Sequence, residues 1–213
     1  MEGVETKSCG ERVRRALISV SDKRGLKPLL ETLERYGVEI ISTKGTAERI
    51  RELGYRVEEV SHYTGWPEMP GGLLKTLHPK IFAGILGDPG DPRHREYMEE
   101  NDIDPIDLVV IDLYPFEETV SRDASLDEGV KNIDIGGVAL IRSAAKATLL
   151  HGRVAVIVDP GSYPSLIHEL EINRGAIPGE VKRRWAVEAF KRTARYEVEI
   201  SKYLEREVLG CGD

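Results

Sequence analysis

Short apolar segments alternate with segments of helical periodicity along most of the chain, and this alternation constrains the fold more than any other feature. Glycine or polar loops follow the apolar segments, which have the length and composition of buried strands. Strands that alternate with helices form a parallel sheet covered by helices. We expect strands at 16–20, 38–41, 55–60, 107–113 and 154–158. We expect helices at 26–36, 47–53, 93–101, 163–171 and 178–208, and a further helix that follows a turn at 132–137 and runs through 146.

Residues 61–87 interrupt this alternation with a passage rich in glycine and proline, which includes the run TGWPEMPGG at 64–72. Long loops inside a compact domain are usually functional. We therefore expect a single long functional loop over 61–87.

The length of the chain suits one domain. Its 213 residues and 23.8 kDa can bury one sizeable hydrophobic core. We expect a loose polar tail at 1–14 and a single domain at 15–208. No apolar run reaches the roughly 18 residues that a membrane span needs, and the N-terminus lacks the layout of a signal peptide. The expected location is the cytoplasm.

Charge and metal-ligand residues argue against several classes of protein. A net charge of −7 disfavours a surface that coats nucleic acid, although a local cationic pocket is compatible with it. Cys9 and Cys211 lie in opposite polar tails and predict neither a disulfide framework nor a zinc site. The histidines lack the two-histidine helical spacing of a metalloprotease. We expect no metal and no nucleic-acid partner, and we expect the important basic residues to gather in one anion-binding pocket.

Two loops that follow predicted strands carry hydroxyl and ammonium groups that suit a phosphate. The first contains Ser19, Ser21 and Lys23, and the second, at 43–46, opens a helix whose free N–H groups and dipole favour an anion. Either loop alone is more simply explained by helix capping and solvated charge. Together, at the ends of adjacent strands, they favour an anion site.

Three further groups could carry chemistry. Lys75 and His78 follow a Gly-Gly pair and suit acid–base work, with a surface lysine and a backbone-bonded histidine as the alternative. Tyr114 stands at the end of a predicted strand, where a packed phenol is the alternative. Asp134 heads the helix that carries Lys146, and helix capping explains Asp134 equally well. None of these groups is specific on its own.

The order and wording of these motifs are specific. They are SVSDK at 19–23, ST-x-GTA at 42–47, TG-x-PEM at 64–69, GG-x-x-KTLHP at 71–79, LYPF at 113–116, NIDIGG at 132–137 and RSAAK at 142–146. Over about 15–203 the chain resembles the inosine monophosphate cyclohydrolase family, the N-terminal part of a bifunctional purine-biosynthesis enzyme. The resemblance implies a methylglyoxal-synthase-like α/β fold: a doubly wound parallel sheet over about 15–160, with a helical C-terminal extension at 161–208.

The resemblance also implies a reaction. 5-Formamidoimidazole-4-carboxamide ribotide would close its ring to inosine monophosphate with loss of water, without redox change or phosphoryl transfer, so no cofactor is implied. The implied catalytic residues are Lys146 for acid–base catalysis, Lys75 at the oxyanion, and Tyr114 and Asp134 to orient the amide and relay protons. The implied substrate-binding residues are Ser19, Ser21, Asp22, Lys23, Thr43, Lys44, Gly45, Thr46, Thr76, Asp112, Ile135 and Gly136.

Some residues depart from what the resembled family usually has. It usually has threonine at Arg24, glycine at Lys44, arginine at Leu73, and asparagine at Asp112 and at Ala147. Leu73 removes an expected cation and Asp112 adds a negative charge. We expect Lys44 and Arg24 to restore the lost positive charge.

The main alternative is a non-catalytic nucleotide-sensing domain of the same fold class. It would use the 43–46 loop without needing the catalytic set. Methylglyoxal synthase itself is disfavoured, because its Asp/His arrangement is not found in this chain. The resemblance further implies a homodimer, and a stand-alone cyclohydrolase would depend on a separate formyltransferase. The aromatic stripe of the predicted C-terminal helix would lie at the dimer interface or, more commonly, in the core.

Overall fold

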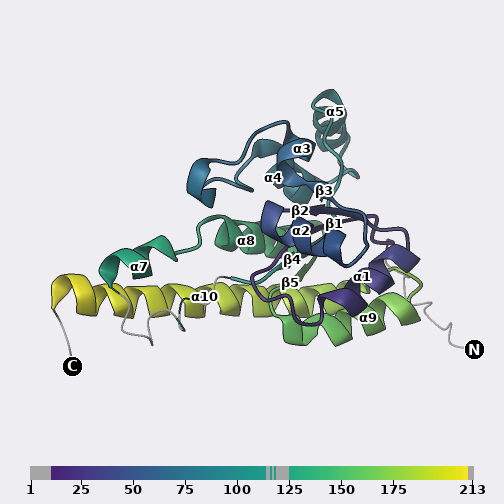
Figure 1. Cartoon of the computed structure of the whole chain (residues 1–213). Helices are drawn as coiled ribbons and strands as arrows, with labels where there is room; N and C mark the ends of the chain where they lie inside the picture. The colour runs from purple at the N-terminus through teal and green to yellow at the C-terminus, as the bar shows by residue number, and fades with distance from the viewer. Residues whose placement is uncertain (1–10, 114–115, 117, 119–124, 211–213) are drawn as a thin grey trace, which may run out of the picture.

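The computed structural model describes residues 11–113, 116, 118 and 125–210, and the strands within these ranges form one parallel sheet (Figure 1). Its strand order is β3-β2-β1-β4-β5, so the chain winds outward from β1 in both directions. Every pairing is parallel, which confirms the predicted doubly wound α/β sheet. The strands are β1 (Arg15–Ser19), β2 (Glu39–Ser42), β3 (Glu58–Glu59), β4 (Leu108–Ile111) and β5 (Ala155–Ile157).

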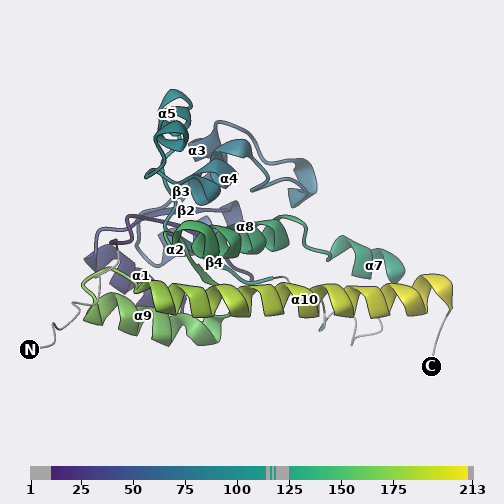
Figure 2. The same ribbon diagram turned by 180° about the vertical axis from the view of Figure 1, so that it is seen from behind.

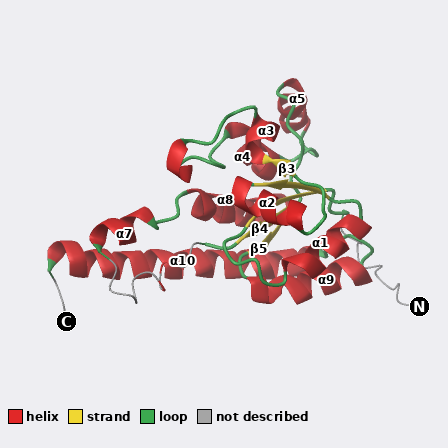
Figure 3. Cartoon of the chain, in the orientation of Figure 1, coloured by secondary structure: helices red, strands yellow, loops and turns green. Residues whose placement is uncertain are grey.

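Helices cover both faces of the sheet, as the apolar residues of its central strands require (Figure 3). Side chains alternate along each strand, so Leu17 and Val109 enter one core and Ile18 and Val110 enter the other. The first core is closed by α4 (Pro79–Leu86), α8 (Gly136–His151) and much of α10 (Gly179–Leu209). The second is closed by α1 (Leu26–Arg35), α2 (Lys44–Glu52) and α9 (Tyr163–Ile172).

The expectation of one long loop over 61–87 is wrong. The segment contains α3 (Val60–Thr64), a 3-10 turn at Pro70–Gly72 and α4. Pro79 at the first helical position and the fully buried Ile81 and Ile85 explain why α4 forms here. Within 61–87 the irregular chain is confined to 65–69, 73–78 and Gly87.

Other boundaries also differ from those predicted. The strand expected at 55–60 pairs only over Glu58–Glu59, because α3 starts at Val60. The helix expected at 47–53 begins three residues earlier, at Lys44, and the helix expected through 146 continues to His151. The helix expected at 93–101 is α5 (Pro92–Glu100).

Two segments have structure that the sequence did not suggest. Residues 126–131 form α7 (Leu126–Lys131), which a reciprocal Ser125–Glu128 capping box starts. Within the expected loose tail, Val13 is buried and Arg12 forms an antiparallel bridge with Ala176. The expectation of a loose tail is therefore wrong for 11–14.

The last helix, α10, has 31 residues and is about 46 Å long. Figures 1 and 2 show that it runs beneath α8 and continues past the sheet to α7. Tyr196 and Tyr203 on its apolar stripe are buried within the chain, with Phe190 and Trp185 partly buried beside the two cores. These two tyrosines therefore belong to the core of this chain.

Candidate functional site

The carboxyl ends of the central strands meet at a cavity of about 310 Å³. Register places Ser19 beside Ile111 and Ile18 beside Ser42, so the loops after β1, β2 and β4 are neighbours. β1 is the strand at which the winding direction reverses, the position at which open α/β sheets bind ligands. The cavity is lined by Ser19, Thr43, Gly71, Gly72, Leu73, Lys75, Thr76, Leu77, Ile111, Asp112, Lys131, Asn132, Ile133, Asp134, Ile135, Gly136, Gly137 and Leu140.

One wall of the cavity is the start of α2. The Oγ1 atom of Thr43 lies 2.8 Å from the Oγ atom of Ser19, and Thr43 makes no side-chain cap to its own helix. The backbone N–H of Lys44 has a long contact, 3.4 Å, with a carboxylate oxygen of Glu68. The hydroxyls and the N-terminus of α2 together form a cradle suited to a phosphate. Lys44, Gly45 and Thr46 continue α2 beside this wall, outside the cavity lining.

Lys23 holds the two phosphate-type loops together. Its ammonium group donates to the carbonyl of Val20 and to Thr46 Oγ1, the latter at 3.0 Å. Burial lowers the pKa of Lys23 below its ordinary value. Lys23 does not line the cavity. Its positive charge lies next to Thr46, in the first turn of α2.

Asp112 closes the loop after β1. Its carboxylate accepts the backbone N–H groups of Ser21 and Asp22, the latter at 2.7 Å. Burial raises the pKa of Asp112, and these hydrogen bonds oppose the increase. The two amides are thus occupied by an internal carboxylate.

Arg24 does not restore positive charge at the cavity, so that expectation is wrong. Its Nε atom donates to Asp22 at 2.7 Å, and this hydrogen bond lowers the pKa of Asp22. Arg24, Ser21 and Asp22 line a second cavity, of about 840 Å³, on the other side of Asp112. The polar side chains at the end of β1 and in the loop after it therefore line two different cavities. Ser19 lines the first, and Ser21, Asp22 and Arg24 line the second.

The segment that follows the 3-10 turn supplies Lys75 and Thr76. Gly71 and Gly72 both have positive φ, 78° and 71°, which suits glycine. The side chain of Lys75 folds over Gly72, where a Cβ would stand 2.8 Å from Nζ. Thr76 is 5% exposed. His78 instead caps α4, because its Nδ1 accepts the Lys80 N–H at 3.2 Å, which confirms the structural alternative for that histidine.

Asp134 faces this segment from the start of α8. Its Oδ1 accepts the N–H of Gly137 at 2.7 Å, and a Cβ at Gly137 would stand 2.5 Å from Oδ2. A Cβ at Gly136 would stand 2.9 Å from Thr76 Oγ1. The carboxylate therefore both caps the helix and lines the cavity.

One of the predicted catalytic residues, Lys146, is not part of the lining of this cavity. Lys146 lies exposed on α8, ten residues and about 15 Å of helix beyond Gly136, and is absent from the lining. Tyr114 lies outside the described residues, as do Cys9 and Cys211.

The cavity also contains residues that the sequence analysis missed. Lys131 and Asn132 lie next to the predicted turn at 132–137, and a charged side chain beside that turn was the available signal. The lining includes two lysines, Lys75 and Lys131, and two aspartates, Asp112 and Asp134. The expectation of a pocket in which basic residues gather is therefore wrong, because charges of both signs line it.

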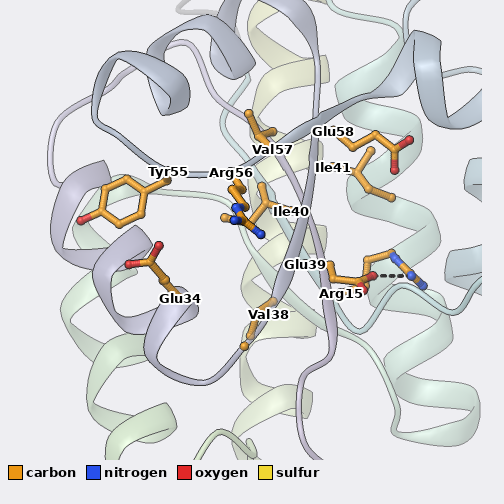
Figure 4. Close-up of a pocket in the computed structure, with 11 residues that line it drawn as sticks. Arg15, Glu34, Val38, Glu39, Ile40, Ile41, Tyr55, Arg56, Val57 and Glu58 are labelled. Atoms are coloured by element: carbon orange, nitrogen blue, oxygen red, sulfur yellow. Dashed lines mark hydrogen bonds and ion pairs between the residues drawn. The ribbon is translucent and has the colours of Figure 1, made fainter.

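A further cavity, of about 560 Å³, lies away from these groups near the amino end of β2 (Figure 4). The ring of Tyr55 lies near Glu34, and Arg15 is paired with Glu39. Neither Ser19 nor Thr43, whose hydroxyl groups form the cradle, lines this cavity. This cavity thus shares no phosphate-type loop with the candidate site.

Neither a metal cluster nor a membrane-spanning helix is found within the described ranges. Among those residues, no group of three or more histidine, cysteine, aspartate or glutamate side chains could hold a metal ion. No helix built from them has the length and apolar character needed to cross a bilayer.

Comparisons with known proteins identify the family of the chain. Residues 25–139 match the MGS-like domain, and residues 144–210 match the AICARFT/IMPCHase bienzyme family. The chain is 47% identical over 192 residues to the bifunctional purine biosynthesis protein PurH of Synechococcus sp. (strain WH7803), covering 89% of this chain and 36% of that protein. It is 49% identical over 191 residues to PurH of Persephonella marina, covering 90% and 36%.

A solved structure has the same fold over nearly its whole length. "Crystal structure of ForH" superposes with a TM-score of 0.77 at 28% identity, covering 92% of this chain and 98% of that one. The chain spans about 36% of the length of the curated relatives. With its parallel sheet, its loops at the strand ends and a family match over 25–139, the chain belongs to the MGS-like domain family and corresponds to the N-terminal part of PurH.

Proposed function

We propose that the chain is an inosine monophosphate cyclohydrolase. It would close the ring of 5-formamidoimidazole-4-carboxamide ribotide with loss of water, in the last step of purine synthesis. The names of the relatives and the match of 144–210 to a family that includes IMPCHase support this assignment. The single structural observation that carries it is the cavity at the carboxyl ends of the central strands, which Lys75 and Asp134 line together with Thr43, the residue before α2.

The phosphate of the nucleotide would bind at the start of α2. Ser19 and Thr43 would donate hydroxyl hydrogen bonds, and the first N–H groups of α2 would add theirs. Lys23 and Lys44 would supply charge from beside the cradle. The imidazole portion would then extend toward Thr76, Ile135 and Gly136, which line the remainder of the cavity.

Ring closure needs two proton transfers and no change of oxidation state. The carboxamide nitrogen forms a bond to the formyl carbon and loses a proton, while the formyl oxygen gains one. The resulting hydroxyl leaves as water, and the formamido nitrogen loses its proton. Because the reacting groups belong to one molecule, holding them face to face provides much of the acceleration.

The first proton transfer and the orientation of the attacking amide each have a candidate group. Lys75 would stabilise the developing oxyanion and protonate it. Asp134 would accept a hydrogen bond from the carboxamide and orient it for attack. Lys146, as acid–base residue, and Tyr114, as orienting residue, stay predictions that substitution will test.

A direct assay of ring closure tests the proposal. The purified chain is mixed with the formylated ribotide, and the change in ultraviolet absorbance is followed. We expect turnover that falls about 10²- to 10³-fold in Lys75→Met and in Asp134→Asn. Lys80→Met, whose ammonium group bonds Asp102 at 3.1 Å outside the cavity, serves as the matched control with unchanged turnover.

Two other outcomes would be informative. Nucleotide binding without turnover by the unaltered chain would favour the nucleotide-sensing alternative, which needs only the cradle. Near-normal turnover by a folded Lys146→Met would remove Lys146 from the mechanism. The hydrolase class in the ring-closing direction, a cytoplasmic homodimer and a formyltransferase that supplies the substrate are parts of the same proposal.

A further inference from the structure

We propose that Tyr196 of α10 is a positioning residue that holds Asp134 in the geometry needed for ring closure. The inference rests on the proposed function for its catalytic consequence. The hydrogen bond between Tyr196 and Asp134 is a feature of the structure, so it can be tested whether or not the chain catalyses ring closure.

The hydroxyl group of Tyr196 lies between two backbone groups of the segment that carries Asp134. It accepts the N–H of Asp134 at 2.7 Å and donates to the carbonyl of Asn132 at 3.4 Å. The side chain is 2% exposed. The ring of Phe116 packs against it edge-on, with centroids 6.1 Å apart.

The segment that carries Asp134 belongs to neither flanking helix, although the N–H groups of Asn132 and Ile133 donate back to carbonyls of α7. Residues 132–135 connect α7 to α8, and no sheet pairing includes them. The Asp134 carboxylate is fixed by Gly137 and its backbone N–H is fixed by Tyr196. Two separate anchors thus define where the carboxylate sits, and one of them comes from 62 residues further along the chain.

That distant anchor comes from the part of the chain that the MGS-like match does not cover. The match ends at residue 139, whereas α10 lies in the 144–210 region that matches the bienzyme family. Figure 2 shows α10 running beneath α8 toward α7. We infer that this C-terminal helix adapts the general fold by fixing Asp134.

Tyr203 offers a matched control on the same helix. Its hydroxyl donates to the carbonyl of Ser125 at 2.9 Å, and its ring also packs on Phe116. It is 1% exposed, against 2% for Tyr196. Tyr203→Phe therefore removes a comparable hydrogen bond from α10 without touching the Asp134 segment.

The catalytic test is a double-mutant cycle with Tyr196→Phe and Asp134→Asn. The phenylalanine keeps the ring packing and removes the hydroxyl. We expect kcat to fall about tenfold in Tyr196→Phe, with KM within about twofold, because a displaced group weakens the chemical step. In the Asp134→Asn background, Tyr196→Phe should change kcat less than about twofold, since it acts through that carboxylate.

Hydrogen exchange provides a readout that does not require turnover. Exchange of the 132–137 amides should be at least about tenfold faster in Tyr196→Phe than in the unaltered chain or in Tyr203→Phe. Unchanged exchange there overturns the inference, as does an equal loss of kcat in both Asp134 backgrounds. If the unaltered chain does not turn over the ribotide, the proposed function fails while the exchange result still decides the contact.

Discussion

The carboxylate of Asp112 accepts the backbone N–H of Asp22 at 2.7 Å, across the gap between β4 and the loop after β1. The same carboxylate accepts the N–H of Ser21. Two consecutive amides in such a loop can bind an external anion. Here a side chain of the protein already occupies them, and it also lines the cavity proposed to take a nucleotide.

Removing the charge of Asp112 should strengthen binding of phosphate-bearing ligands. Two unit charges roughly 6 Å apart interact by about 3 kcal/mol at an effective dielectric of about 20. After screening, we expect Asp112→Asn to bind inosine monophosphate about tenfold more tightly by calorimetry. Asp159→Asn makes the same change in net charge in the second cavity and should leave the affinity unchanged. Weaker binding by Asp112→Asn would show that the carboxylate supports the ligand.

Asp112 should also make stability depend on pH. Burial raises its pKa above the ordinary value of about 3.9. A carboxyl with a raised pKa in the folded state stabilises that state below its ordinary pKa, and this stability is lost as pH rises through the raised value. The free energy of unfolding of Asp112→Asn, relative to the unaltered chain, should therefore be larger at pH 7 than at pH 3.5. Urea unfolding at both values measures this difference, and equal differences would contradict the prediction.

The cradle at the start of α2 should bind substrate without taking part in the chemistry. Thr43→Val keeps the shape of the side chain and removes the hydroxyl that contacts Ser19. Because Thr43 makes no side-chain cap to α2, the helix should be unaffected. We expect KM to rise about tenfold while kcat stays within about twofold, the pattern of lost ground-state binding. A fall in kcat alone would argue against the cradle, and Ser162→Ala in the second cavity serves as control.

Two buried tyrosines should respond oppositely to loss of their hydroxyl groups. Tyr163 is 2% exposed, and its hydroxyl has no hydrogen-bond partner among the described residues. Tyr163→Phe should therefore leave the free energy of unfolding unchanged or raise it by about 1 kcal/mol. Tyr196→Phe, which loses a satisfied hydroxyl, should lower it by about 1–2 kcal/mol. Guanidinium unfolding of both variants decides, and a loss in Tyr163→Phe as large as that in Tyr196→Phe would contradict the assignment.

A glycine in α7 should not tolerate a methyl group. Alanine usually stabilises a helix by about 1 kcal/mol relative to glycine. A Cβ at Gly129, however, would overlap the ring of Tyr203, so Gly129→Ala should destabilise by about 1–3 kcal/mol. Gly179→Ala, where the added atom meets only the flexible end of Arg183 at 3.4 Å, is the control. Thermal unfolding compares the two, and adding Tyr203→Leu should recover part of the loss.

The sequence predicted features that depend on local periodicity. The strands around Leu17 and Val109 and the long helix that carries Tyr196 follow from apolar spacing alone. The two loops proposed to bind phosphate could also be predicted from local sequence, because hydroxyl side chains and a glycine directly follow a predicted strand. The start of α7 was missed although Ser125 and Glu128 form a recognisable capping box, because six residues carry too little periodicity.

Contacts between distant segments could not be predicted from the same patterns. Asp112 reaching Ser21 and Tyr196 reaching Asp134 join residues 91 and 62 positions apart. Whether Arg24 faces one cavity or the other depends on its neighbour Asp22, not on its own identity. Lys146 shows the limit most clearly, because its motif matches and yet α8 places it on an exposed face away from the cavity.

The anchoring of Asp134 by α10 has a consequence for the order of events during synthesis. The sheet strands, the cradle and the Lys75 segment all leave the ribosome before Tyr196 does. Translation proceeds at roughly 5–20 residues per second, so the 62 residues between Asp134 and Tyr196 delay the anchor by several seconds. During that interval the Asp134 segment of a nascent chain has no anchor from α10. In the cyclohydrolase proposed above, catalytic competence would therefore be among the last properties that the chain acquires during synthesis.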